Sequence, residues 1–424
     1  MDFRSCINAL KSKGKLVECD DELDLNLEVT KKIESLHPQP ILFNKTPYMK
    51  IATNIFSNRF SYAEFLNIGT THFLKNLHER LHHGKTDLEL LNKTYGEVEM
   101  HRPDLSQLPI LTHYSGDGGP YITSAVWFVN DAKRGRNLSY HRMMIVDKQH
   151  GVVRVVENRG MHQALLNSGG SVDVAICIGP PPAVLLAAAC SPDSSVDEVQ
   201  LAACLDKLTL VKCKTSDLYV PKDCEIVIEG KLVSEMRNEG PFVDITGTWD
   251  EIRMQPVFVC SRISHRINPI YHALVPAKSE HCMLMGMPKE LDIYLAVNEK
   301  CPCLDVRITD GGSSWLHAVV QIEKRHDADA IRAIEAAFQA HKSLKHCVVV
   351  DSDIDIYNMN EVEWAIATRF QADKDIVLLT EQPSSSLDPS AFHVPGKKST
   401  GSKLGIDATI KSRYVNRDMF KKIS

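Results

Sequence analysis

The sequence predicts a protein of the α/β (α+β) class, built as three domains with a β-rich domain in the middle of the chain. The chain has 424 residues, which is more than one hydrophobic core usually serves. Helix and strand patterns alternate towards both ends, whereas the middle consists mainly of short apolar runs separated by turn signals. We therefore expect a central β domain with an α/β domain before it and another after it.

Residues 1–105 are expected to form the N-terminal α/β domain. Helical periodicity covers Phe3–Lys13 and Leu27–Leu36, and a short apolar strand is predicted at Ile41–Phe43. The polar segment His101–Asp104 contains a proline and marks the expected end of this domain.

Residues 106–277 are expected to form a barrel-like β domain. In this region Ala183–Cys190 and Asp197–Leu205 are predicted to be the helices, the second with Ser195 as its N-cap. The predicted strands are Tyr121–Val129, Met143–Val146, Val152–Val156, Val172–Ile178, Val211–Cys213, Glu225–Glu229 and Pro256–Ser264.

Residues 278–407 are expected to form the C-terminal α/β domain, followed by a tail helix within residues 408–424. Gln382–Lys403 is rich in Ser, Pro, Gly and Lys and is predicted to be a loop. The predicted helices are Lys289–Glu299, Asp327–His341 and Asn360–Thr368, and the predicted strands are Ala318–Ile322, His346–Val350 and Ile376–Leu379.

Composition favours small-molecule chemistry in a reducing cytoplasm. The formal net charge is −5 with the charges mixed along the chain, so nucleic acid is not expected as a partner. The 12 cysteines show no paired framework. The longest apolar region, Val174–Cys190, is broken by Gly179–Pro182, and the N-terminus lacks the pattern of a signal peptide. We expect no membrane span.

Two carboxylates flank a Gly-Pro turn in the segment Glu239-Gly-Pro-Phe-Val-Asp244. Such a turn can direct both acids into one cleft. One acid would pair with Arg142 and stay ionised, while the other would lie in a drier place, where a raised pKa lets it exchange a proton near neutral pH. A solvated acidic turn is the alternative interpretation.

Several other side chains suit a metal ion or a phosphate group. Asn137, His162 and Glu198 offer oxygen and nitrogen ligands of the kind that Mn²⁺ or Mg²⁺ accepts. Lys403 lies between glycines, in a segment suited to phosphate binding. The alternatives are a surface strand around Asn137 and a purely structural histidine.

A series of segments, in the same order along most of the chain, resembles the UbiD-type decarboxylases. The segments are Asn137-x-x-x-x-Arg142, Pro180–Ala183, Asp197–Ala202, Asp217–Pro221, Glu225–Gly230, Glu239–Phe242 and Lys403–Thr409. The resemblance implies a carboxy-lyase that removes CO₂ reversibly, without oxidation, from an unsaturated or aromatic acid. It also implies a split β-barrel central domain that holds prenylated FMN with Mn²⁺ and K⁺.

The resemblance also implies roles for individual residues. Arg142, Glu239 and Asp244 would form the catalytic group, with Asp244 as the proton donor after CO₂ leaves. The implied cofactor contacts are Asn137, Ser139, Tyr140, His141, Arg142, His162, Ala188, Glu198 and Lys403, of which Asn137, His162 and Glu198 would bind the metal. A flavin prenyltransferase would supply the cofactor, and homodimers or homohexamers are expected.

The length and the segment His113–Ile122 are most similar to the archaeal branch of this family. The role known for that branch is decarboxylation of trans-anhydromevalonate 5-phosphate to isopentenyl phosphate in a modified mevalonate pathway. Arg134, Arg136, His141 or the segment Arg262–Arg266 would then bind the substrate phosphate. The alternatives are a decarboxylase of 4-hydroxybenzoate-type acids, a split-barrel flavin reductase and a non-catalytic flavin-binding protein.

Overall fold

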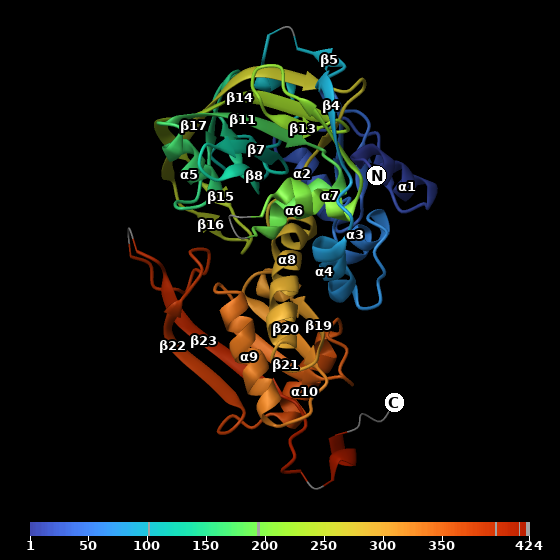
Figure 1. Cartoon of the computed structure of the whole chain (residues 1–424), viewed down its shortest axis with the longest axis vertical. Coiled ribbons are helices and arrows are strands. Elements are labelled where there is room, and N and C mark those ends of the chain that lie inside the picture. Colours follow the sequence, from blue (N-terminus) through green and yellow to red (C-terminus); the bar gives the residue numbers. More distant parts are fainter. Residues whose placement is uncertain (101, 193–195, 395–396, 415, 421–424) are drawn as a thin grey trace. The chain divides into compact units, whose positions relative to one another are not determined.

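The structure, a computed structural model, describes residues 1–100, 102–192, 196–394, 397–414 and 416–420 (Figure 1). The chain divides into two compact units. The first unit contains residues 1–70, 76–244 and 249–284, and the second contains residues 71–75, 245–248 and 285–424. Residues 1–105 and 106–277, expected as separate domains, thus lie mostly in the first unit.

The N-terminal part of the first unit is a small sheet with helices, as predicted. Its strands run in the order β1-β2-β3-β18, and helix α1 is capped by the Asp2 carboxylate, which accepts a hydrogen bond from the Ser5 N–H. The elements are α1 (Phe3–Ser12), β1 (Val17–Cys19), α2 (Glu28–Leu36), β2 (Ile41–Phe43), β3 (Lys50–Thr53), α3 (Arg59–Phe65), α4 (Phe73–His83) and β18 (Ile270–His272).

A largely antiparallel sheet forms the centre of the first unit, with its strands in the order β6-β9-β10-β17-β14-β11-β7-β8 and β5 paired with β17. Its core contains Trp127, Phe258 and Ile176, which are fully buried. The strands are β5 (Val98–Glu99), β6 (Tyr121–Ile122), β7 (Val126–Asp131), β8 (Gly135–Tyr140), β9 (Met143–Ile145), β10 (His150–Val153), β11 (Ser171–Ile178), β14 (Ile226–Glu239) and β17 (Arg253–His265).

Other elements of this unit border the sheet. They are the helices α5 (Gly160–Asn167), α6 (Pro182–Cys190) and α7 (Glu198–Leu205), and the strands β4 (Leu88–Thr94), β12 (Leu208–Lys212), β13 (Tyr219–Pro221), β15 (Phe242–Val243) and β16 (Trp249–Asp250). Strand β15 pairs with β16, so that Phe242 lies opposite Asp250. Helix α5 was not predicted, because it is short and begins at a glycine.

The predicted strand Tyr121–Val129 is wrong in one respect, since it is interrupted between β6 and β7. At the interruption the Thr123 and Ser124 hydroxyls donate hydrogen bonds to the carbonyls of Leu274 and His272, each over 2.5 Å. These side-chain bonds replace the regular ladder. His101 and Ser195 lie outside the described residues, and the N-cap of α7 is Asp197, which accepts from the Val199 N–H.

The second unit contains a sheet in the order β19-β20-β21-β23-β22, in which β20, β21 and β23 are parallel. Its elements are α8 (Ser279–Asn298), which begins in the first unit, β19 (Cys303–Ile308), β20 (His317–Ile322), α9 (Ala328–Ala340), β21 (His346–Asp351), α10 (Met359–Arg369), β22 (Ile376–Pro383) and β23 (Thr400–Ala408). The prediction began α8 after Pro288, which in fact lies inside the helix.

Two predictions for the end of the chain are wrong. Lys403 lies in strand β23 and not in a loop, because β23 is held by ladders to β21 and β22 on both sides. The expected tail helix is absent from the described residues of 408–424, where only the short 3-10 helix Arg417–Phe420 occurs. In this segment the Lys411 ammonium donates a hydrogen bond to the Thr409 carbonyl over 2.9 Å. No helix of the described chain has the length and apolar character needed to cross a bilayer.

Replacing Arg369 by alanine should destabilise the second unit by about 3 kcal/mol, because it removes a fully buried side chain together with its hydrogen bonds to two carboxylates. The Arg369 side chain is fully buried and donates to Asp351 over 3.1 Å and to Asp353 over 2.6 Å. Urea unfolding with hydrogen exchange of the second unit measures the effect. The control Lys374→Ala removes an ion pair to Asp373 in which both side chains are exposed, and it should cost less than about 1 kcal/mol. Equal losses would contradict the expectation.

Candidate active site

The centre of the site is the guanidinium group of Arg142, which lies between β8 and β9 with its side chain 8% exposed. It forms a bidentate pair with Glu239, through Nε at 2.9 Å and Nη2 at 3.0 Å. Its Nη1 donates to Asp244 over 2.6 Å, and its Nη2 also donates to Asp250 over 2.7 Å. The structure therefore brings together the three predicted catalytic residues and adds a third carboxylate.

The turn after β14 sets the positions of the two predicted acids. Gly240 has a φ of +102°, a backbone conformation that favours glycine. The loop at Gly118 packs so closely here that a Cβ atom on Gly118 would lie 2.3 Å from the Gly240 carbonyl oxygen. Phe242 follows, and the Arg142 guanidinium lies 4.4 Å from the centre of its ring. The ring face adds a cation–π contact to the ion pairs.

The prediction that only one acid would pair with Arg142 is wrong, because a guanidinium has enough N–H donors for several carboxylates. The exposure of the two acids does differ, since the Glu239 side chain is fully buried and that of Asp244 is 18% exposed. Glu239 also accepts a hydrogen bond from the Tyr121 hydroxyl over 3.0 Å. Glu239 is therefore the fixed partner, and Asp244 is the one nearer to solvent.

Burial and the neighbouring charges shift the pKa values of Arg142 and Asp250 in opposite directions. Burial alone would lower the pKa of Arg142, but its bonds to Glu239, Asp244 and Asp250 outweigh burial and raise the pKa. For Asp250, burial would raise the pKa, but the two guanidinium groups of Arg253 and Arg142 hold it below its ordinary value. Arg142 and Asp250 are thus both charged at neutral pH.

Asn137, His162 and Glu198 come from three elements that meet at β8. Asn137 lies on β8, His162 is in the first turn of α5 and Glu198 begins α7. The start of α5 touches Asn137 so closely that a Cβ atom on Gly160 would lie 2.1 Å from the Asn137 Oδ1. Glu198 accepts from the N–H of Leu138, the next residue of β8, over 3.2 Å.

The chemistry of these three side chains fits a hard divalent cation. They offer an amide oxygen, an imidazole nitrogen and a carboxylate oxygen, and no thiolate. His162 accepts the Asn158 N–H at Nδ1 over 3.3 Å, which directs its Nε2 away from the backbone. Among the described residues no group of three or more His, Cys, Asp or Glu side chains could hold a metal, so a site here depends on the amide of Asn137.

A chain of hydrogen bonds orients the Asn137 amide. The His141 Nδ1 lies 2.9 Å from the Arg154 carbonyl, which can only accept, so Nδ1 carries the proton. His141 Nε2 then accepts from the Ser139 hydroxyl over 2.9 Å, and the Ser139 oxygen accepts from the Asn137 Nδ2 over 3.3 Å. Asn137 therefore presents Oδ1, the atom predicted to bind the metal, towards α5. The predicted common face of these three residues is confirmed.

Of the remaining predicted cofactor residues, Ala188 and Lys403 are buried and Tyr140 is half-buried. The Tyr140 hydroxyl donates to the Leu185 carbonyl on α6 over 3.0 Å, and Ala188 lies buried one turn further along the same helix. Lys403 belongs to the second unit, where its ammonium donates to the carbonyls of Lys342 and Leu344, both over 2.7 Å. Burial lowers the pKa of Lys403 to about 8. Its assignment to a phosphate stays a prediction.

Most of the cations proposed for a substrate phosphate already have partners. Arg136 pairs with Asp197, Arg262 with Glu99, and Arg266 with both Asp2 and Glu225. His141 is occupied in the hydrogen-bond chain to Asn137, and Arg134 is exposed. The structure thus leaves the phosphate contacts as a prediction.

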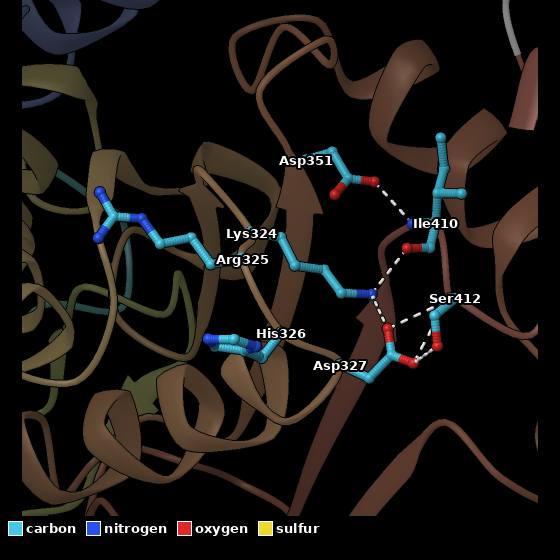
Figure 2. A pocket seen from close by; sticks show the side chains of 7 residues that line it. All are labelled: Lys324, Arg325, His326, Asp327, Asp351, Ile410 and Ser412. Carbon is cyan, nitrogen blue, oxygen red and sulfur yellow. Dashed lines mark hydrogen bonds and ion pairs between the residues drawn. The ribbon is translucent and has the colours of Figure 1, made fainter.

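A cavity of about 330 Å³ lies in the second unit, at the carboxyl ends of β20, β21 and β23 (Figure 2). Lys324 reaches across it and donates to the Ile410 carbonyl over 2.7 Å, while pairing with Asp327 over 2.9 Å. Arg325 and His326 point the other way in Figure 2. The ammonium that lines this cavity is therefore already neutralised, and the Arg142 cluster is the better candidate for chemistry.

The sequence analysis missed Asp250, and it included Tyr121 only as part of longer segments, without a role of its own. Asp250 comes eleven residues after Glu239, and only the pairing of β15 with β16 brings it to the guanidinium. The one available signal was the Thr-Gly-Thr turn before Trp249, which is typical of a hairpin.

Comparison with known proteins identifies the class. The chain matches three consecutive domains of 3-octaprenyl-4-hydroxybenzoate carboxy-lyase, the N-terminal domain over residues 7–81, the Rift-related domain over 90–279 and the C-terminal domain over 282–408. These models cover most of its length. The chain belongs to the UbiD family of decarboxylases.

Relatives within the family give a finer comparison. The chain is 39% identical to the anhydromevalonate phosphate decarboxylase of Methanosarcina mazei, over 96% of each chain. It is 38% identical to the enzyme of the same name from Methanocaldococcus jannaschii, over 95% of this chain and 96% of that one. The solved structure of the UbiD-class enzyme HmfF from Pelotomaculum thermopropionicum with FMN has a TM-score of 0.94 at 32% identity, covering 100% of this chain and 97% of HmfF. The predicted family and fold class are confirmed.

Acid should destabilise the protein partly through His113, in the loop that packs against the Glu239 turn. Burial lowers the pKa of His113 to about 3, so the unfolded chain takes up this proton first, and stability is lost as the pH falls from about 6.5 towards 3. The loss at pH 5 should be about 2 kcal/mol. Unfolding of His113→Gln at pH 7 and pH 5 should show a smaller pH effect than the wild type, whereas the exposed control His326→Gln should match it. An unchanged pH effect in His113→Gln would contradict this.

Proposed function

We propose that this protein is a prenylated-FMN-dependent decarboxylase of an α,β-unsaturated acid, converting trans-anhydromevalonate 5-phosphate to isopentenyl phosphate. The observation that carries the proposal is the Arg142 guanidinium paired with Glu239 and Asp244, two residues after the end of β8, the strand that carries Asn137. The names of the relatives that align over nearly the whole chain support the substrate.

The donor set at β8 supports a bound flavin and metal. HmfF has been solved with FMN and, in an evolved dimeric form, with prenylated FMN. In the proposal Asn137, His162 and Glu198 would hold Mn²⁺, K⁺ would be bound as well, and Lys403 would bind the flavin phosphate. When bound, prenylated FMN supplies the electron sink for the pair left by CO₂, which amino-acid side chains do not offer.

The protein's own groups then have separate tasks. Nη1 of Arg142 binds the substrate carboxylate in place of Asp244, because it is the one guanidinium nitrogen bonded to a partly exposed acid. Glu239, fully buried, keeps Arg142 charged and oriented. Asp244 donates the proton to the carbon from which CO₂ departs, and the new C–H bond takes the place of the C–C bond.

The partners follow from the same proposal. A flavin prenyltransferase supplies the mature cofactor, the chain assembles as a homodimer or homohexamer, and the enzyme works in the cytoplasm. The 12 cysteines, none of them in a disulfide among the described residues, suit a reducing compartment.

Substrate assays of the holoenzyme test the function. The protein is co-expressed with a flavin prenyltransferase, supplied with Mn²⁺ and K⁺, and given anhydromevalonate 5-phosphate or 4-hydroxybenzoate; CO₂ release is expected from the first. Glu239→Gln should lower kcat at least about 100-fold, since Arg142 loses its bidentate partner. Release from 4-hydroxybenzoate alone would favour the aromatic-acid alternative. Oxidation of pyridine nucleotides without CO₂ release would favour a flavin reductase.

A glycine substitution tests the metal site. Gly160→Ala should lower Mn²⁺ content and flavin retention at least about 10-fold, because the added methyl group displaces the Asn137 Oδ1 that lies 2.1 Å from its position. Metal analysis and flavin absorbance of the purified protein measure both. Gly311→Ala is the matched control, since a Cβ atom there meets nothing within 4 Å. Full metal content in Gly160→Ala would remove Asn137 from the proposed ligands.

A further inference from the structure

Asp250 shares the Arg142 guanidinium with the two acids that the sequence predicted. Its Oδ2 accepts from Nη2 of Arg142 over 2.7 Å, which is shorter than the 3.0 Å bond from the same nitrogen to Glu239. The Asp250 side chain is 6% exposed. It arrives on β16, which pairs with β15, whereas Glu239 arrives at the end of β14. The guanidinium is therefore held by carboxylates from two separate strands.

The second oxygen of Asp250 is fixed as well. Oδ1 accepts from Arg253 through Nη2 at 2.8 Å and Nε at 3.3 Å, and from the Glu251 N–H at 3.1 Å. Arg154 also faces this carboxylate, with its Nε 3.9 Å from Oδ2. Asp250 thus lies among three guanidinium groups, where its charge reduces the repulsion between them.

The bonds of Arg142 divide into a fixed set and an exchangeable one. Nε and Nη2 are held by buried carboxylates, those of Glu239 and Asp250. Nη1 donates to Asp244, which is the most exposed of the three acids. If Asp244 turns away to give up a proton, the guanidinium keeps its orientation and Nη1 becomes available to another carboxylate.

We propose that Asp250, held by Arg253, is a positioning residue for the decarboxylation. It fixes Nη2 of Arg142, so that Nη1 exchanges Asp244 for the substrate carboxylate without the guanidinium turning. This inference rests on the proposed function and adds to it a residue outside the predicted catalytic group. Loss of Asp250 should therefore affect the catalytic step. Loss of Arg253 should have the same effect, because Arg253 holds Asp250 in place.

Kinetics of the holoenzyme with anhydromevalonate 5-phosphate test the proposal. Asp250→Asn should lower kcat at least about 10-fold, with flavin content, flavin spectrum and melting temperature close to those of the wild type. Arg253→Gln should show a similar loss. The double variant should be no worse than the poorer single variant, because both substitutions remove the same clamp. Asp250→Glu should recover part of the activity.

The matched control is Arg237→Gln, which removes an exposed ion pair to Glu235 on the same strand as Glu239 and should leave kcat unchanged. Wild-type kcat in Asp250→Asn would overturn the proposal, as would losses that multiply in the double variant. A loss of activity matched by equal losses of flavin and thermal stability would also overturn it, because that pattern indicates a structural role alone. A wild-type enzyme that releases no CO₂ would instead overturn the proposed function, so the two failures are distinguishable.

Discussion

The burial of one positive charge constrains the architecture of this site. A guanidinium with its side chain 8% exposed is tolerated in a protein interior only when acids and good hydrogen-bond geometry offset the loss of water. Here the required acids come from the end of β14, from the turn after it and from β16. Gly118 packs closely on Gly240, in the turn that carries two of these acids, so that a Cβ atom on Gly118 would lie 2.3 Å from the Gly240 carbonyl oxygen.

Strand β8 connects this charge to the second cluster of polar residues. Asn137 and Ser139 on this strand and His141 just after it are joined by hydrogen bonds, and Arg142 follows directly. Residue Arg154 joins the two parts, since its carbonyl accepts from His141 and its N–H donates to the Arg142 carbonyl over 3.0 Å. A shift of β8 would therefore disturb both clusters. A single short segment of sequence thus carries both the proposed metal ligand Asn137 and the proposed catalytic residue Arg142.

The sequence was enough to predict those features of the site that depend only on residues close together in the chain. The Gly-Pro turn between Glu239 and Asp244 and the alternation along β8 depend on neighbouring residues, and both were predicted correctly. Asp250 was missed because its approach depends on how two short strands pair, which is a property of the tertiary structure. Lys403 was placed in a loop because its glycine- and serine-rich surroundings resemble one, whereas ladders on both sides make it part of a strand. Neighbouring strands of the sheet here outweigh local composition.

The exposure of the three carboxylates gives each a different capacity for chemistry. Glu239 is fully buried and bonded to Arg142 and Tyr121, so that protonating it would break the bidentate pair and leave a buried cation less compensated. Asp250 is nearly as buried, and two guanidinium groups hold its pKa low. Asp244 accepts from Nη1 of the guanidinium, and 18% of its side chain is exposed. A proton donor must both lose and regain its proton, and regaining it requires contact with solvent or with substrate. Of the three acids, Asp244 meets that requirement with the least loss of ion pairing, because Glu239 and Asp250 keep the guanidinium paired while Asp244 is neutral.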